Sequence, residues 1–150
     1  MAFSNSMADN TVDRLLVFRV AEQNYAAVAS VVREILPAQN ATRIPGATDS
    51  VKGLINVRGR LITLVDGRKA LSHPPNGGDG PIVILDVGEI AVGFAVDTIL
   101  DFCSVSAGDL TERGELPGID PRLVRAVGRQ ADISFVLLDV EALLSPIMVA

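Results

Sequence analysis

The stretch that most constrains the fold of this chain runs from Val51 to Asp66 and pairs two strand-like patterns around a glycine turn. Both halves are rich in Ile, Val and Leu, which are typical of β-strands. Gly59, between them, supplies the conformational freedom that a tight reversal needs. The pattern predicts a β-hairpin with Arg58 and Arg60 beside its turn, a feature that shapes a surface rather than a catalytic pocket.

Length and composition place the chain among ordinary globular domains. Its 150 residues suit one domain, and a domain of that size buries about 68–70% of the surface that its unfolded chain exposes. Hydrophobic residues make up 49% and charged residues 21%, a balance that excludes a disordered chain. The formal net charge of -5 argues against nonspecific nucleic-acid binding, which depends on Lys and Arg neutralising phosphates. We therefore expect a folded domain with no nucleic-acid partner.

Few residues offer catalytic or metal chemistry. Cys103 is the one cysteine and His73 the one histidine, which excludes an internal disulfide and a multi-histidine metal site. Cys103 follows Phe102 in an apolar strand, where a free cysteine is a small buried hydrophobe. His73 stands beside two prolines, so we expect a solvated loop residue. There is no P-loop and no Gly-x-Ser-x-Gly turn. We expect no enzyme, cofactor or metal, although carboxylates that converge in space leave a small hydrolase open.

The segment from Pro81 to Leu100 has the length of a membrane-spanning helix but not its character. Three acidic residues interrupt it, and each costs about 2.5–3.5 kcal/mol near a bilayer centre. Two apolar runs around Gly88-Glu89 predict a β-hairpin instead. Residues 1–10 lack the basic start and apolar run of a signal peptide, and Met7 offers an alternative start to Met1. We expect a cytoplasmic protein without direct membrane insertion.

The rest of the chain predicts short strands joined by turns. Asp66 is expected to cap a short helical piece through Leu71, because its side-chain oxygen can accept from free backbone N–H groups. The other expected elements are strands over 15–20, 24–28 and 34–36, a turn over 30–33, a loop over 37–46 and a polar connector over 72–80.

The second half of the chain repeats the pattern of the first. Residues 17–36 align without a gap on residues 84–103, an offset of 67 positions. Only two of the twenty pairs are identical, so the similarity lies in the pattern. A second echo, at an offset of 73, aligns the strand that ends in Asp66 with Leu137-Leu-Asp139. Neither half alone is a comfortable size for a stable core, so we expect two small β units that bury their apolar strands together.

These features together resemble the chemotaxis coupling-protein (CheW-like) family. That family's signature is a Gly-apolar-x-Asn-apolar-Arg-Gly strand followed by an apolar strand ending in Asp, and Gly53 to Asp66 matches it. Further matching segments are Leu15-Leu-Val-Phe-Arg-Val20, Tyr25 to Ile35 with its Val-x-Glu element, Thr42-Arg-Ile-Pro-Gly46 and Gly93-Phe-Ala-Val-Asp97. The chain departs from the common pattern at Ala27, Thr63 and Gly67. The resemblance extends from Leu15 to Leu144.

The resemblance implies a mainly β fold: two packed five-stranded SH3-like β-barrel subdomains with a few short helices, and with strands exchanged between the barrels. We accordingly expect a flexible tail over 1–13, a single domain of two intertwined barrels over 14–145 and a C-terminal tail over 146–150.

The resemblance also implies a function: an adaptor that couples the cytoplasmic tip of a methyl-accepting chemoreceptor to the regulatory domain of a histidine kinase, at membrane-associated receptor arrays. The same fold serving a non-flagellar pathway, such as surface motility, stays open. No reaction is implied.

Five residues correspond to the family's receptor-facing set, expected in a groove between the barrels: Val32, Glu34, Gly53, Arg58 and Phe102. Glu34 and Arg58 could pair with each other or with charges on the receptor. A purely structural role stays open for three of the five: Val32 and Phe102 as core residues, and Gly53 at a bulge or close backbone approach. The sequence does not locate the kinase-binding residues.

Overall fold

The computed structural model describes residues 13–76, 78–112, 118–130 and 132–148. The tail expected over 1–13 lies outside the described residues, except for Asp13, which begins the first strand.

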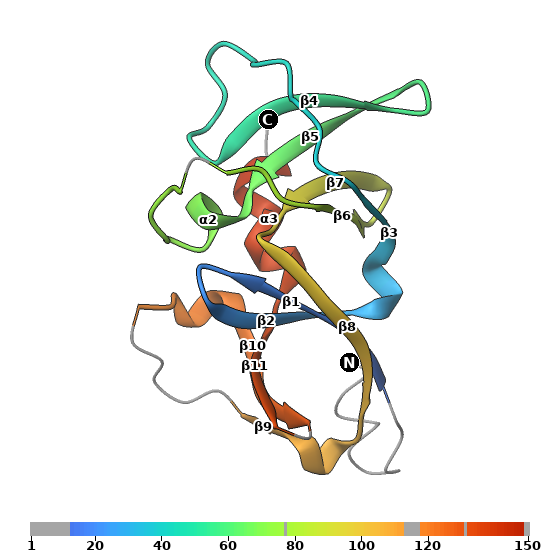
Figure 1. The fold of residues 1–150 in the computed structure, drawn as a ribbon, viewed down its shortest axis with the longest axis vertical. Helices are drawn as coiled ribbons and strands as arrows, with labels where there is room; N and C mark the ends of the chain where they lie inside the picture. Colours follow the sequence, from blue (N-terminus) through green and yellow to red (C-terminus); the bar gives the residue numbers. More distant parts are fainter. Residues whose placement is uncertain (1–12, 77, 113–117, 131, 149–150) are drawn as a thin grey trace.

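Two curled β-sheets stacked along the long axis make up the molecule (Figure 1). Barrel 1 has six strands in the order β8-β1-β2-β11-β10-β9, and barrel 2 has five in the order β3-β6-β7-β5-β4. The strands of barrel 1 are β1 (Asp13–Val20), β2 (Gln23–Val28), β8 (Thr98–Val105), β9 (Leu110–Glu112), β10 (Val124–Gln130) and β11 (Ile133–Leu138). Those of barrel 2 are β3 (Val32–Leu36), β4 (Val51–Val57), β5 (Arg60–Asp66), β6 (Ile82–Val87) and β7 (Ile90–Ala95).

Short helices connect these strands: η1 (Ala29–Val31), α2 (Gly67–Ala70), η2 (Ala107–Asp109), η3 (Pro121–Leu123) and α3 (Val140–Met148). The expected two-barrel, mainly β fold is confirmed, with one strand more than expected in barrel 1 because the short β9 pairs with β10. No helix in the described part of the chain is both long and apolar enough to cross a membrane.

Strand exchange intertwines the barrels. The hairpin β1–β2 opens the chain, yet it pairs with β8 and with the last strand, β11. The next strand, β3, leaves barrel 1 and pairs with β6 in barrel 2. Each barrel is thus completed by strands that lie far away in the sequence.

The internal repeat predicted from the sequence is visible in the strand register. An offset of 67 carries β2 onto β7, most of β1 onto β6, and β3 into β8. Each exchanged strand has a bulge at the equivalent position, Arg33 in β3 and Leu100 in β8, where the register shifts by one residue. An offset of 73 carries β5 onto β11 and the helix cap Asp66 onto Asp139, which accepts from the Ala142 N–H.

A shared apolar core joins the barrels. Its members come from both, including Phe18 and Tyr25 of barrel 1 and Val83 and Phe94 of barrel 2, and all four are fully or almost fully buried. Two smaller clusters fill the barrel interiors, around Phe135 in barrel 1 and around buried Ile and Leu residues in barrel 2. Because a buried Val, Leu, Ile or Phe stabilises a fold by about 1.5–3 kcal/mol, the shared core contributes strongly to the attraction between the barrels.

The predicted hairpins form. Val57 pairs with Arg60 across a turn made by Arg58 (φ 51°) and Gly59 (φ 86°), so Arg58 lies in the turn itself. The segment that could suggest a membrane helix is the hairpin β6–β7 followed by β8. The cap by Asp66 is confirmed, since its carboxylate accepts from the backbone N–H groups of Arg68 (2.9 Å) and Lys69 (3.3 Å).

Two boundaries differ from the expected ones. β3 begins at Val32, where we expected a turn, because Val32 pairs with Leu85 before the bulge. Helix α3 continues beyond residue 145, where we placed a C-terminal tail, because Ile147 packs against the shared core.

Candidate functional site

The exchanged strand β3 carries two of the predicted site residues, Val32 at the boundary between the barrels and Glu34 further into barrel 2. Val32 is half-buried and packs against the shared core. Arg33, the bulge residue, forms an ion pair with Asp86 at 3.0 Å. Glu34 follows the bulge, and its side chain is 24% exposed. The register therefore turns Val32, opposite Leu85, towards the shared core, and Glu34, opposite Ile84, towards the interior side of barrel 2.

Arg58, in the β4–β5 turn, forms an ion pair with Glu34 on β3 of the same barrel. The hydrogen bond to Glu34, and then the attraction of its charge, raise the pKa of Arg58. The Arg58 side chain is 71% exposed, so the pair adds little to stability because water screens it. Of the two pairings left open by the sequence, the structure contains the one between Glu34 and Arg58.

Phe102 lies on β8, the exchanged strand of barrel 1. It is opposite Leu16, a member of the shared core, yet it is 37% exposed. The guanidinium carbon of Arg14 lies 5.3 Å from the centre of its ring, within cation–π range. Ile35 is the repeat equivalent of Phe102: it is opposite the core residue Val83 and is 36% exposed. Phe102 and Ile35 are therefore partly exposed apolar side chains at equivalent positions of the two barrels.

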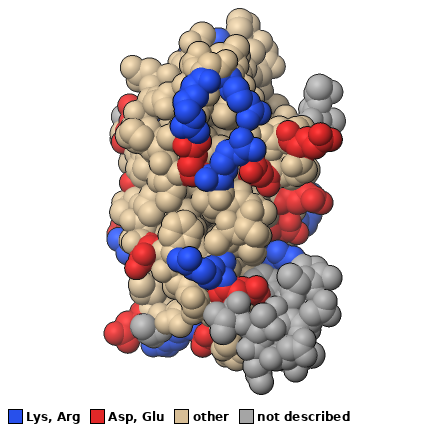
Figure 2. Space-filling model, turned by 90° about the vertical axis from the view of Figure 1, so that its right-hand side faces the viewer, with Lys and Arg blue, Asp and Glu red and all other residues tan. Residues whose placement is uncertain are grey.

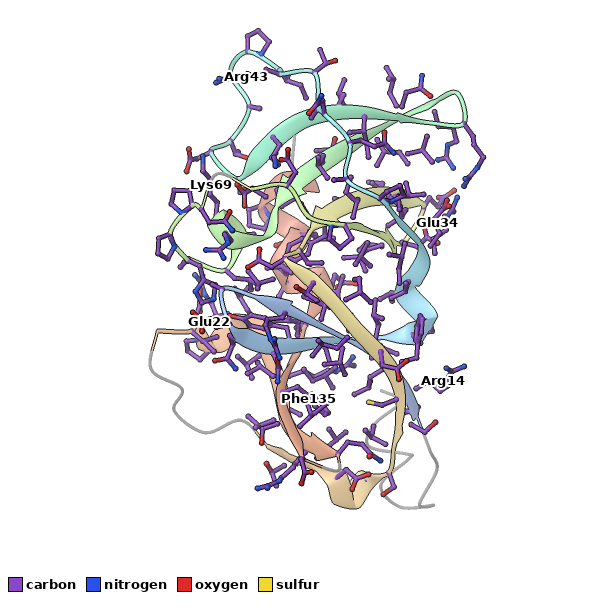
Figure 3. All side chains as sticks on the ribbon, viewed as in Figure 1. Arg14, Glu22, Glu34, Arg43, Lys69 and Phe135 are labelled. Atoms are coloured by element: carbon purple, nitrogen blue, oxygen red, sulfur yellow. The ribbon has the colours of Figure 1, made fainter. Side chains whose placement is uncertain are left out.

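We call the set Val32, Glu34, Ile35, Arg58 and Phe102 the junction surface. Figure 3 places Glu34 of barrel 2 and Arg14 of barrel 1 along the same side of the molecule, and Arg14 lies over the ring of Phe102. Figure 2 views that side directly. Basic side chains with acidic ones beside them gather in its upper part, and an uncharged band separates them from charged groups below (Figure 2).

Gly53 does not lie with the other four predicted residues. It is buried near the start of β4, at a register shift, with φ +146°. A Cβ at this position would overlap the backbone of Thr42, whose N–H and carbonyl both bond to Leu54 at 2.8 Å. The close backbone approach left open by the sequence is thus what the structure contains, and Gly53 permits the bridge that helps to close barrel 2.

The solvated loop position predicted for His73 is wrong. His73 is half-buried, and its Nε2 lies 2.6 Å from the hydroxyl oxygen of Tyr25. Tyr25 lies 48 positions earlier in the chain, so no local pattern indicates the contact.

Cys103 packs against the interior of barrel 1, although it is half-buried and not buried as we expected. Burial, followed by the charges of Asp101 and Asp109, raises the pKa of its thiol, which disfavours the reactive thiolate. Within the described ranges, no group of three His, Cys, Asp or Glu side chains is arranged to hold a metal ion.

Sequence reasoning missed a second apolar patch on barrel 2. Leu61 is 68% exposed and Ile90 is 46% exposed. The parallel register of β5 and β7, which pairs Thr63 with Val92, places Leu61 beside Ile90 on the same face. The alternation of β5 contained the signal, because Ile62 and Leu64 face the barrel interior and Leu61 must face outward.

A double β-barrel with large exposed apolar side chains, and with no metal-binding cluster among the described residues, has surface features typical of a protein-binding scaffold. Comparison with known proteins agrees with this class. The family model described as CheW-like domain matches residues 14–147. The chain is 26% identical to the chemotaxis protein CheW of Klebsiella aerogenes, over 97% of this chain and 90% of that protein. It is 31% identical to the chemotaxis protein CheW of Bacillus subtilis, over 70% of this chain and 69% of that protein.

A solved structure shares the fold. The crystal structure of the scaffolding protein TtCheW from Thermoanaerobacter tengcongensis aligns with a TM-score of 0.82 at 22% identity, covering 88% of this chain and 92% of that one. The chain belongs to the CheW-like domain family, a family of chemotaxis scaffold proteins.

Proposed function

We propose that this protein couples the cytoplasmic tip of a methyl-accepting chemoreceptor to the regulatory domain of a histidine kinase. The observation that carries the proposal is the family match over residues 14–147, which spans both barrels. An adaptor of this kind performs no reaction. It holds two partners on one rigid body, so that the conformational state of one biases the other. Its place is the cytoplasmic face of a receptor array, where many weak contacts act together.

The junction surface is the proposed receptor site. Phe102 and Ile35 offer apolar contacts from the two barrels, and the Glu34–Arg58 pair offers charge. Charged groups at the edge of an interface select partners more than they add affinity. Gly53, which is buried, acts through the fold of barrel 2 and not through contact with the receptor.

The patch of Leu61 and Ile90 is the proposed kinase site. An adaptor needs a second surface that stays free when the first is occupied, and this patch lies on a different face of the β4–β5 hairpin from the Arg58 turn contact. Large exposed apolar side chains that lie side by side are typical of protein–protein contacts. The proposed partner is the kinase regulatory domain, with a complementary apolar surface.

The test measures binding of a receptor-tip fragment and of the kinase regulatory domain separately, both from the same organism as this protein. We expect Arg58→Ala to weaken receptor binding while the melting temperature stays nearly unchanged, because the side chain is exposed. Arg122→Ala is the matched control: Arg122 is 85% exposed and pairs with Asp120 in barrel 1, away from the junction surface. Receptor binding that survives Arg58→Ala and Phe102→Asp together would refute the proposed receptor site.

For the kinase site, Leu61→Asp is expected to weaken kinase binding and to leave receptor binding intact. Ile133→Asp is the control, because Ile133 is also exposed, at 40%, but lies on β11 of barrel 1. An equal loss of kinase binding in both variants would point to a general effect of surface charge and would exclude the patch of Leu61 and Ile90 as the kinase site.

Two alternatives make different predictions. A non-flagellar pathway keeps both binding events but changes the receptor and the output, so co-purification from native lysate separates it. A carboxylate-dependent hydrolase predicts a substrate whose turnover an Asp or Glu substitution abolishes, and a negative substrate screen removes it.

A further inference from the structure

The chain crosses between the barrels at two repeat-equivalent points that differ in their contacts. The first crossing is η1, between β2 and β3, and the second is the short link between β7 and β8. The offset of 67 aligns Ser30 in η1 with Asp97 in the second link. Ser30 is exposed, whereas Asp97 is half-buried and lies at the centre of a hydrogen-bond cluster.

Asp97 connects both barrels at once. Its carboxylate accepts two hydrogen bonds from Arg68 of α2, at 3.1 and 2.6 Å, which is the paired geometry that makes Arg–carboxylate contacts strong. The same carboxylate accepts from the Ala21 N–H at 2.7 Å, and its own N–H donates to the Arg19 carbonyl at 3.0 Å. Ala21 and Arg19 belong to the β1–β2 hairpin of barrel 1, while Arg68 follows β5 of barrel 2.

The turn held by Asp97 is conformationally costly. Ala21 and Glu22 both have positive φ, 52° and 68°, without being glycine. A residue with a Cβ pays roughly 1–2 kcal/mol for this conformation. The hydrogen bond from Ala21 to Asp97 offsets part of that cost, so the contact keeps this end of barrel 1 in place.

A second contact lies beside the first. The Tyr25 hydroxyl of barrel 1 meets His73, which follows α2, at 2.6 Å. The backbone N–H of His73 donates to the Arg68 carbonyl at 2.7 Å, and the Arg68 guanidinium donates to the Pro74 carbonyl at 2.9 Å. Arg68 therefore links both contacts into one network. We call Arg68, Asp97, Tyr25 and His73 the latch.

The latch adds directional contacts to the packed core between the barrels. Apolar burial itself is non-directional, whereas hydrogen bonds have a defined geometry and so restrict the angle between the groups that they join. The hydrogen bonds of the latch are well protected from water, since the side chains of Arg68 and Asp97 are only 18% and 26% exposed.

The latch and the junction surface lie at opposite edges of the boundary between the barrels. Figure 3 places Glu22, in the turn held by Asp97, on one side of the molecule, and Glu34 on the other. We propose that Arg68, Asp97, Tyr25 and His73 are positioning residues that fix the angle between the barrels and thereby preset the junction surface for its partner. The second half of this statement rests on the proposed receptor site, while the first half does not.

The test separates these halves. Spin labels at Glu89→Cys, in the β6–β7 turn of barrel 2, and Arg129→Cys, on β10 of barrel 1, report the distance between the barrels in a Cys103→Ser background. Arg68→Met and Tyr25→Phe remove one contact each, and Tyr25→Phe keeps the ring that stacks on Phe18 if Arg68→Met does not fold. The control is Arg122→Met, which breaks an Arg–Asp pair within barrel 1.

We expect both latch variants to broaden the distance distribution and Arg122→Met to leave it unchanged. Receptor-tip affinity, measured without labels, is expected to fall about two- to thirtyfold, the range by which residues remote from a ligand alter its binding. An unchanged distance distribution in folded Arg68→Met and Tyr25→Phe proteins would overturn the latch. A broadened distribution with unchanged receptor affinity would uphold the latch and overturn the junction surface as the receptor site.

Discussion

Replacing Gly53 with alanine provides a stringent test of how the signature strand works. The structure gives Gly53 a backbone conformation, φ +146°, that side chains rarely adopt, and a Cβ would lie 2.6 Å from the carbonyl carbon of Thr42. Such a conformation costs about 1–3 kcal/mol for a residue other than glycine. The Thr42 backbone must also move, which endangers its two 2.8 Å hydrogen bonds with Leu54, each worth about 0.5–1.5 kcal/mol.

We therefore expect Gly53→Ala to lower the free energy of unfolding by about 2–6 kcal/mol. At 2–4 °C per kcal/mol for a chain of this size, the melting temperature should fall by at least about 4 °C. Gly59→Ala is the matched control. Gly59 also has positive φ, 86°, but a Cβ there meets nothing within 4 Å, so its cost stays near 1–2 kcal/mol.

The assay is urea denaturation followed by circular dichroism, combined with receptor-tip binding corrected for the folded fraction. Gly53→Ala should lose stability, and the binding of its folded fraction should change little. Arg58→Ala should instead keep the stability of the parent protein and bind the receptor tip more weakly. A Gly53→Ala protein that is as stable as the parent but fails to bind the receptor tip would refute the reasoning, because Gly53 would then contact the partner directly.

Three further outcomes are expected. Asp139→Ala, which removes the cap of α3, should lower stability by about 0.5–2 kcal/mol in urea denaturation, and no change would mean that α3 does not need its cap. Burial, followed by the charge of Arg68, holds the pKa of His73 below its ordinary value of 6.5 against the opposing charge of Asp97. Because the folded state binds the proton less readily than the unfolded state, stability should decline as the pH falls below 6.5 and through the lower folded pKa, and His73→Gln should flatten that decline. An unchanged slope would exclude His73 as its source. Cys103 should react with a thiol reagent at neutral pH much more slowly than in unfolded protein, since burial raises its pKa, and equal rates would show an open strand.

The sequence predicted those parts of the fold that leave a local or repeated trace. The turn at Gly59 and the cap at Asp66 depend on neighbouring residues, and both formed. The offset of 67 between residues 17–36 and 84–103 correctly aligned three strands with their counterparts. It could also have indicated Ile35, because the alignment pairs Ile35 with Phe102, a residue already selected for the site.

The latch could not be predicted, because its members are distant in the sequence. Tyr25 and His73 lie 48 positions apart, and Arg68 and Asp97 lie 29 apart. The local sequence around His73, a serine before it and two prolines after it, is typical of an exposed loop. Only the fold brings Tyr25 into contact with His73. The role of Gly53 was open for the same reason: only the fold shows that the backbone of Thr42 approaches it.

The junction surface has two sides, or walls: β3 of barrel 2 and β8 of barrel 1. Strand exchange explains why these two walls have equivalent positions. The exchanged strands β3 and β8 stand first in the order of their sheets, so among the described strands each pairs with a neighbour on one side only. The shared bulge turns the residue before it, Val32 or Ile99, onto the common core, and leaves Ile35 or Phe102 partly exposed.

Because Ile35 and Phe102 are equivalent positions, the charged groups near them can be compared, and these groups differ between the two barrels. In barrel 2 the exposed apolar residue Ile35 is next in sequence to Glu34, whose side chain lies on the other face of β3 and pairs with Arg58. In barrel 1 Phe102 lies under Arg14. A receptor tip bound as proposed would therefore meet similar apolar positions but unlike charges in the two barrels. A symmetric pair of walls would accept an elongated partner in either direction, whereas unlike charges distinguish the two directions. Under the proposed receptor site, the apolar positions would favour binding at the junction, and the ion pair and the cation–π contact would set the orientation of the receptor tip.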